Sequence, residues 1–215
     1  MSHVNEYKRP QCLTCLRPHS TCICQWITPT TSLVQVLILQ HPLEVFQAKG
    51  SARLLHLSLM NSQLVVGETF QPDSLHAILY SDDKLPVLLY PETPEMKTLD
   101  CGLSVSPESW QLKNCGRIRL VVLDATWRKS RKMLYLNPLL QSLPRIGLQP
   151  LTASCYHIRK AQKPHQLSSL EATCLALAQV EQHPEKYSAL LKSFEGFVTQ
   201  QLANKTRKRW QESAE

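Results

Sequence analysis

The chain has 215 residues, 43% of them hydrophobic, and a formal net charge of +7 from 24 Lys and Arg against 17 Asp and Glu. This length and composition fit one globular domain with an ordinary core and exclude a disordered or fibrous chain. The positive charge favours a polyanionic partner, nucleic acid first and an anionic membrane surface second. Because no apolar run approaches the roughly 20 residues of a membrane-spanning helix and the N-terminus lacks an apolar signal-peptide core, we expect a cytoplasmic protein with no membrane partner.

Cysteines gather near the N-terminus, where a short segment holds four of the chain's eight: Cys12, Cys15, Cys22 and Cys24. The two-residue gap of the first pair lets both thiolates face one point, and the second pair completes a tetrahedral site for structural zinc. The second pair is spaced more tightly than usual, and His19 is an alternative ligand. Disulfides and free thiols are the other interpretations, and the missing secretion signal argues against disulfides. We predict a zinc-binding segment over residues 1–30 and an α/β domain with a basic C-terminal helix over residues 31–215.

The first predicted element of this domain is a buried strand over residues 32–40, which are mostly aliphatic. Pro42 suits the first turn of a following helix, and Glu44 suits the positive end of its dipole, so both residues have an adequate structural explanation. The leucine pattern predicts this helix over residues 44–60. Two short strands are then predicted over residues 75–80 and 86–90, separated by a turn.

The central predicted element is a buried parallel strand over residues 117–123 that ends at Asp124 and leads into a basic helix. In open α/β sheets ligands bind outside the carboxyl ends of strands, so Asp124 is a candidate site residue, together with Trp127 and the cations of the next turns. The alternatives are that Asp124 only caps the helix, that Trp127 is a core residue and that the cations form a solvated face.

Towards the C-terminus, residues 145–151 are expected to form a strand, and a helix is expected to open at Ser168. Ser168 and Glu171 have the spacing of a capping box, which alone would explain both. A last helix is predicted over residues 184–209. Its basic end with Trp210 suits either an RNA backbone with a stacking platform or simple complementation of the helix dipole.

The stretch Asp124-Ala125-Thr126-Trp127 resembles the Asp-x-Thr-Trp signature of the DTW-domain proteins. The resemblance continues through five further motifs in the family's order: HPLE at 41–44, GSARL at 50–54, LYP at 89–91, YHIRK at 156–160 and SSLEA at 168–172. It covers nearly the whole chain, including the cysteine-rich head. The known members of this family are tRNA-uridine aminocarboxypropyltransferases related to SPOUT-class RNA methyltransferases.

The resemblance implies a SPOUT-like α/β fold, with a parallel sheet, flanking helices and a knotted chain, plus the small N-terminal zinc knuckle. It implies an enzyme that moves the 3-amino-3-carboxypropyl group of S-adenosylmethionine to N3 of a tRNA uridine and releases 5′-methylthioadenosine. The cofactors would be S-adenosylmethionine and structural zinc, and the partner would be tRNA. The oligomeric state stays open, with a monomer favoured.

Uridine N3 carries a proton that a positioned carboxylate can remove, so Asp124 is the expected base, with Thr126 and Trp127 beside it. The resemblance also implies a set of cofactor-side residues: Leu89, Tyr90, Pro91, Glu44, Arg53, Ser169 and Glu171. Arg53 or Arg159 would bind the carboxylate of the cofactor's tail, and Glu44 or Glu171 its ammonium group. The cations expected to hold tRNA phosphates are Lys129, Arg131, Lys132, Arg159, Lys160, Arg207 and Lys208.

Three other functions compete with this one. A SPOUT-like methyltransferase would use the same cofactor and leave S-adenosylhomocysteine. An aminocarboxypropyltransferase for ribosomal RNA would differ only in its RNA substrate. A non-catalytic zinc-knuckle protein would bind RNA without any affinity for the cofactor.

Overall fold

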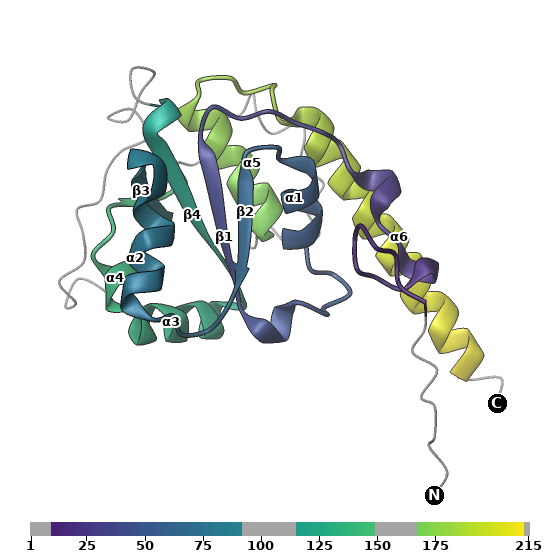
Figure 1. Cartoon of the computed structure of the whole chain (residues 1–215). Coiled ribbons are helices and arrows are strands. Elements are labelled where there is room, and N and C mark those ends of the chain that lie inside the picture. The colour runs from purple at the N-terminus through teal and green to yellow at the C-terminus, as the bar shows by residue number, and fades with distance from the viewer. Residues whose placement is uncertain (1–9, 92–114, 149–166, 213–215) are drawn as a thin grey trace, which may run out of the picture.

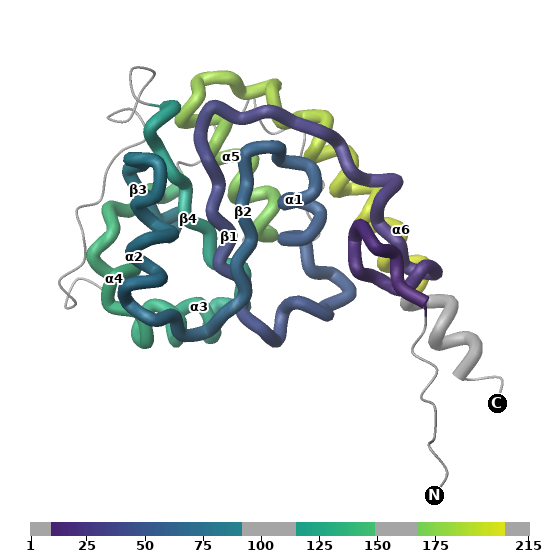
Figure 2. The backbone as a smooth tube through the Cα atoms, viewed as in Figure 1, coloured from purple at the N-terminus to yellow at the C-terminus, as the bar shows by residue number. Residues whose placement is uncertain are grey.

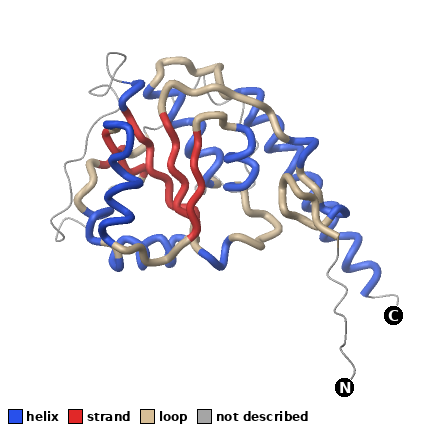
Figure 3. The backbone as a smooth tube through the Cα atoms, viewed as in Figure 1, coloured by secondary structure: helices blue, strands red, loops and turns tan. Residues whose placement is uncertain are grey.

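The computed structural model describes residues 10–91, 115–148 and 167–212, with side chains as far as residue 204. Its centre is a five-stranded sheet in the order β2-β1-β4-β3-β5, in which every pair of neighbours is parallel. The strands are β1 (Gln35–Gln40), β2 (Ser62–Val66), β3 (Leu85–Leu89), β4 (Ile118–Asp124) and β5 (Arg145–Ile146). Figure 3 shows these strands lying between the helices.

The helices of the described residues are α1 (Ala52–Ser58), α2 (Pro72–Tyr80), α3 (Trp127–Leu136), α4 (Pro138–Gln141), α5 (Ser169–Val180) and α6 (Ser188–Glu212). Short 3₁₀ turns include η1 (His19–Thr21), η2 (Cys24–Trp26) and η3 (Pro42–Glu44). No helix among the described residues is long and apolar enough to span a membrane.

Alternation along the strands sorts the helices into two layers. In β4, which is buried along its whole length, Leu120 and Val122 join one hydrophobic cluster with residues of α1, α5 and α6. Val121 and Leu123 join a second cluster with residues of α2, α3 and α4. Because successive side chains of a strand point to opposite faces, each face of the sheet has its own layer of helices, as Figure 1 shows. The predicted α/β sheet with flanking helices is thus confirmed.

The strand predicted over residues 32–40 is shorter in the structure, because β1 begins only at Gln35. The backbone N–H groups of Leu33 and Val34 donate to Oε1 of Glu181, at 2.8 and 3.2 Å, in place of a strand partner. β4 lies where the central strand was predicted, and it pairs with β1 along its length, placing Asp124 opposite Gln40.

The helix predicted over residues 44–60 is wrong in its first half. Only η3 and α1 are helical, and they are separated by turns over residues 45–51. Here the guanidinium group of Arg17 donates to the backbone carbonyls of Gln47, Ala48 and Gly50, at 3.3, 2.7 and 3.0 Å. These oxygens therefore accept from a distant side chain, and a regular helix does not continue through them. The strand β2, which follows α1, had not been predicted.

The strand predicted over residues 75–80 is also wrong, because these residues belong to α2. Pro72 occupies the first turn of this helix and Asp73 lies near its positive end. Leu75 and Leu79, four residues apart, are both buried against the sheet, which is helical spacing. The strand predicted over residues 86–90 is confirmed as β3.

Two predictions for the C-terminal half are confirmed. A capping box opens α5, in which the Ser168 hydroxyl accepts from the Glu171 N–H and the Glu171 carboxylate accepts from the Ser168 N–H, at 3.2 and 2.8 Å. The last helix exists but starts at Ser188. Of the strand predicted over residues 145–151, the structure describes β5, and its final residues lie outside the described part.

The cysteine-rich head packs against α6. The Trp26 indole Nε1 donates to Oε1 of Gln200 at 2.6 Å, and the Thr28 and Ser193 hydroxyls are 2.6 Å apart. Ile23 is fully buried and belongs to the same hydrophobic cluster as α5 and α6. In Figure 2 the purple head accordingly lies beside the coloured part of α6.

Candidate functional site

The candidate site lies between β1 and β4, where the chain connections leave towards opposite edges of the sheet. From β1 the chain passes through α1 to β2 on one side, whereas from β4 it passes through α3 and α4 towards β5 on the other. A neighbouring pair of strands with this property forms a topological switch point, where open α/β sheets bind ligands at the carboxyl ends. Asp124 ends β4 and Gln40 ends β1, so the two residues lie at this position.

Asp124 is 6% exposed and is held by two side chains. The Ser169 hydroxyl donates to Oδ1 at 2.6 Å, and the Gln40 amide donates to Oδ2 at 2.9 Å. Burial raises the pKa of the Asp124 carboxyl, the two hydrogen bonds lower it, and the negative charge of Glu44 raises it; the net direction is upward. Asp124 does not cap α3, because Thr126 is the residue that precedes this helix. The alternative of a helix cap is therefore wrong.

Trp127 is not a core residue, because it is 52% exposed. Its ring stacks on the buried ring of Tyr90, with centroids 5.1 Å apart and planes inclined by 9°. The Tyr90 hydroxyl lies 3.3 Å from the Ser130 hydroxyl, and burial raises the pKa of this phenol. Tyr90 thus supports one face of the Trp127 ring, while about half of this side chain stays exposed.

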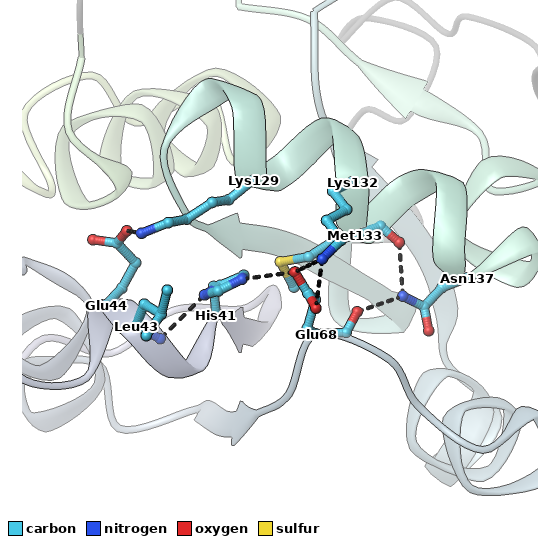
Figure 4. A network of polar contacts seen from close by, with 8 residues as sticks. All are labelled: His41, Leu43, Glu44, Glu68, Lys129, Lys132, Met133 and Asn137. Carbon is cyan, nitrogen blue, oxygen red and sulfur yellow. Dashed lines mark hydrogen bonds and ion pairs between the residues drawn. The ribbon is translucent and has the colours of Figure 1, made fainter.

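A polar network links the loops after β1 and β2 to α3 (Figure 4). The His41 Nδ1 accepts from the Leu43 N–H at 3.1 Å, which leaves its Nε2 as the donor to Glu68 at 3.0 Å. Lys132 pairs with the same carboxylate at 3.0 Å, and Lys129 pairs with Glu44 at 2.7 Å. These contacts fix η3 beside α3.

The residues predicted to bind the cofactor are only partly brought together. Leu89 and Tyr90 lie at the end of β3, next to β4, and Pro91 follows on the surface. Ser169 reaches Asp124 itself, whereas Glu171 is occupied by the capping box. Arg53 lies on α1 and donates to the Thr14 carbonyl of the head at 2.7 Å.

The residues predicted to bind RNA fall into two groups. Lys129 and Lys132 are paired with carboxylates, and Arg131 is exposed on the same helix. Arg159 and Lys160 lie outside the described residues, and so do the side chains of Arg207 and Lys208.

Two residues of the site had not been predicted from the sequence, Gln40 and Glu68. A glutamine ending an otherwise apolar strand was a usable signal for the first, and nothing local marks the second.

The four cysteines of the head form one cluster. Their sulfur atoms all lie within 4.8 Å of one another, with Cys12 to Cys24 at 3.5 Å and Cys15 to Cys22 at 3.7 Å. Tetrahedral zinc with Zn–S bonds of about 2.3 Å separates its sulfurs by about 3.8 Å, so the spacing suits a metal site. The described cysteines are all free, and His19 is not part of this cluster. Backbone N–H groups lower the pKa of Cys12 to about 6, whereas burial and the other sulfurs raise that of Cys24 to about 12.

The chain is similar to three curated proteins named tRNA-uridine aminocarboxypropyltransferase 2. It is 29% identical to the one from Drosophila melanogaster over 203 residues, which cover 92% of this chain and 77% of the fly protein. It is 24% identical to those from Mus musculus and Macaca fascicularis, and these matches cover 91% of this chain but only 64% of each relative. No solved structure matches the chain significantly. The DTW domain model matches residues 9–202, and the chain therefore belongs to the DTW-domain family.

Proposed function

We propose that this protein is a tRNA-modifying transferase that moves the 3-amino-3-carboxypropyl group of S-adenosylmethionine to N3 of a tRNA uridine, with 5′-methylthioadenosine as by-product. The observation that carries the proposal is Asp124, a buried carboxylate held by Gln40 and Ser169 at the switch point of the sheet. The names of the similar proteins support the reaction class. We also propose a cytoplasmic monomer with a SPOUT-like knotted chain.

The charges at the strand ends fit this cofactor. S-adenosylmethionine carries a sulfonium and an ammonium group, and the site offers two carboxylates, Asp124 and Glu44, near enough for Glu44 to raise the pKa of Asp124. Bound there, the cofactor would supply the electrophilic carbon of the aminocarboxypropyl group. Leu89, Tyr90 and Pro91 would hold it from the end of β3, and Glu44 would accept from its ammonium group.

Asp124 acts as the general base. It removes the proton from uridine N3, which is a poor nucleophile until then. The Ser169 hydroxyl and the Gln40 amide hold both carboxylate oxygens in place, so the base needs no reorientation when the uridine arrives. A carboxyl with a raised pKa is also a stronger base than an exposed aspartate.

Trp127 orients the RNA. Its exposed face, supported from behind by Tyr90, stacks on the target uridine after this base has turned out of the folded tRNA. Arg131, Lys132 and the basic end of α6 hold phosphates and give affinity with little sequence preference. Lys132 would have to share its charge between Glu68 and the RNA.

We propose structural zinc for the cysteine cluster. The four sulfurs fit a closed tetrahedral shell, and a divalent cation would let thiols with such different pKa values ionise together. Its chemical contribution is to the fold, because four thiolates leave no position for a substrate. Cys12, Cys15, Cys22 and Cys24 would be the ligands.

The test is mass spectrometry of tRNA nucleosides after incubation of the protein with unmodified tRNA and S-adenosylmethionine. We expect a uridine enlarged by the aminocarboxypropyl group, with 5′-methylthioadenosine in equal amount. A methylated nucleoside with S-adenosylhomocysteine would replace the proposal with a methyltransferase. A product formed on ribosomal RNA but not on tRNA would correct the substrate, and binding without any product would leave a non-catalytic RNA-binding protein.

A further inference from the structure

A cavity of about 600 Å³ adjoins the site on the side of β1 and β2. Gln40 and Val66, at the ends of these strands, form its inner wall, and Leu16 of the head and Phe46 of the loop after η3 form its outer walls. Gln40 is also the residue whose amide donates to Asp124 at 2.9 Å. One side chain therefore separates this cavity from the carboxylate of the candidate base.

The cavity is electropositive. Arg17 and Arg53 line it, and no acidic side chain does so among the described residues. In the described part of the chain, neither guanidinium group has a carboxylate within ion-pair distance. Both instead donate to backbone carbonyls, and Arg17 also interacts electrostatically with Cys15 of the head, so Arg53 is the guanidinium group with the weaker claim on its charge. A guanidinium group in this situation suits an anionic ligand.

Two side chains at the cavity keep N–H groups without an acceptor. Gln201 of α6 is 5% exposed and lines the cavity, and its side-chain Nε2 has no hydrogen-bond partner among the residues that the structure describes. Within the same described residues the Nε of Arg53 has no partner either. Buried donors without acceptors are costly, so a ligand that brings oxygen acceptors to this place would satisfy them.

The remaining walls suit a flat apolar body. Phe46 is 88% exposed at the cavity, and Val45, Leu64 and Val66 add aliphatic surface. Proteins bind single-stranded nucleotides with an exposed aromatic ring and nearby arginine side chains. The ring stacks on the base, and the guanidinium group binds the phosphate.

We infer that this cavity binds a nucleotide of the tRNA next to the target uridine. Its base stacks on Phe46, and its phosphate accepts from Arg53 and Gln201. This inference rests on the proposed function, which brings tRNA to Asp124. It assigns Arg53 to an RNA phosphate, in place of the cofactor carboxylate that the sequence suggested, and it makes the cysteine-rich head one wall of the RNA site.

The experiment measures two equilibrium affinities of the full-length protein: for an unmodified tRNA transcript without cofactor, and for S-adenosylmethionine without tRNA. The variants are Arg53→Gln, Phe46→Ala and Gln201→Leu. Lys49→Gln is the control, because this exposed lysine lies in the same loop and does not line the cavity. We expect each cavity variant to bind tRNA roughly tenfold more weakly, and the cofactor within about twofold of wild type. Arg53→Gln should also flatten the salt dependence of tRNA binding by about one phosphate contact, and Lys49→Gln should change affinity by less than about twofold.

Variants with weakened cofactor binding and unchanged tRNA binding would overturn the inference and assign the cavity to the cofactor. Unchanged tRNA binding in folded variants would overturn it as well, and because Phe46 is exposed, Phe46→Ala gives an answer even if the other variants fold poorly. These outcomes are separate from failure of the proposed function. In that case wild type would bind tRNA through the cavity and yet transfer no aminocarboxypropyl group to it.

Discussion

At the residue scale, the proposed chemistry depends on the opposing effects that set the pKa of Asp124. Burial and the charge of Glu44 raise the pKa of this carboxyl, and the hydrogen bonds from Ser169 and Gln40 lower it. The two hydrogen bonds that favour the charged form also fix the direction of the carboxylate. Burying a carboxylate lowers the free energy of unfolding, and an apolar residue at the same place would avoid this loss. Buried carboxylates therefore concentrate at functional sites.

The hydrogen bond from Ser169 predicts a pH effect. Because this bond stabilises the charged form, Ser169→Ala should raise the pKa of Asp124 further. The rate of transfer falls as Asp124 is protonated, so its acidic limb should move to higher pH in the variant. The pH dependence of the single-turnover rate measures this, and Ser142→Ala, at an exposed serine whose hydroxyl donates to the Leu139 carbonyl, is the control. An unmoved limb in Ser169→Ala would argue against Asp124 as the base.

A stability effect of opposite sign to the usual one is also expected at Asp124. Its pKa is higher in the folded than in the unfolded chain, so the carboxyl costs stability once the pH rises above the unfolded value. Asp124→Asn should therefore melt at a higher temperature than wild type at pH 7, and this advantage should shrink as the pH falls from the raised pKa of the folded chain to the unfolded value near 3.9. The Gln40 amide can turn to accept from the new side-chain amide. A lower melting temperature at pH 7 would mean that the hydrogen bonds outweigh the charge.

At the element scale, the sequence predicts those elements whose signals are local. β4 and β3 are apolar runs between turns, and the capping box of α5 can be read from Ser168 and Glu171 alone. The failures come from distant partners. Arg17 donates to the carbonyls of Gln47, Ala48 and Gly50 in the segment where a longer helix was predicted. Glu181 accepts from the N–H groups of the two residues before β1. β2 is only half-buried, so its sequence lacks a strong apolar pattern, and it directly follows the leucine-rich segment of α1.

The same limit applies to the site. Asp124 could be predicted because it ends a conspicuous strand and opens a basic helix. Its partners could not, because Gln40 and Ser169 are 84 and 45 residues away in sequence and are brought to it only by the β1–β4 pairing and by the position of α5. The pairing of Lys129 and Lys132 with acidic residues likewise needs the folded loops.

The contact between Gly196 of α6 and Trp26 of the head can be tested by mutation. Gly→Ala in a helix interior normally stabilises by about 1 kcal/mol. At Gly196, however, a Cβ atom would lie 2.1 Å from Cζ3 of Trp26. We therefore expect Gly196→Ala to lower the free energy of unfolding by about 1–3 kcal/mol, measured by denaturant titration. Gly116→Ala, where the added methyl group meets open space, is the control and should change stability by less than about 1 kcal/mol. Stabilisation by Gly196→Ala would show that the head is not seated on α6.

At the scale of the whole molecule, the site joins parts that are far apart in the chain. One face of the sheet carries α1, α5 and α6, and both Ser169 and the cavity lie on this side; the other carries α2, α3 and α4. The head contributes a wall of the cavity and rests on α6, while Arg17 and Arg53 tie it to the loop after η3 and to α1. The cysteine cluster thus supports one wall of the cavity for which we propose RNA binding.

Removal of the proposed zinc ion should therefore loosen the head and leave the sheet intact. After chelation, we expect faster amide hydrogen exchange over residues 10–27. Exchange over α2 should be unchanged, because this helix belongs to the second hydrophobic cluster, whereas the head and α6 belong to the first. The metal content measured on the same samples confirms that the ion has left. Unchanged exchange in the head of metal-free protein would show that packing on α6 suffices to hold it.

The most direct test of the central claim is the single-turnover rate of aminocarboxypropyl transfer in Asp124→Asn, measured with saturating tRNA and cofactor. Asp73→Asn, an exposed aspartate in the first turn of α2, is the matched control. We expect a rate lower by about 10²–10⁴-fold in Asp124→Asn, a tRNA affinity close to that of wild type, and an unchanged rate in the control. A rate in Asp124→Asn within about tenfold of wild type would contradict the assignment of Asp124 as the base.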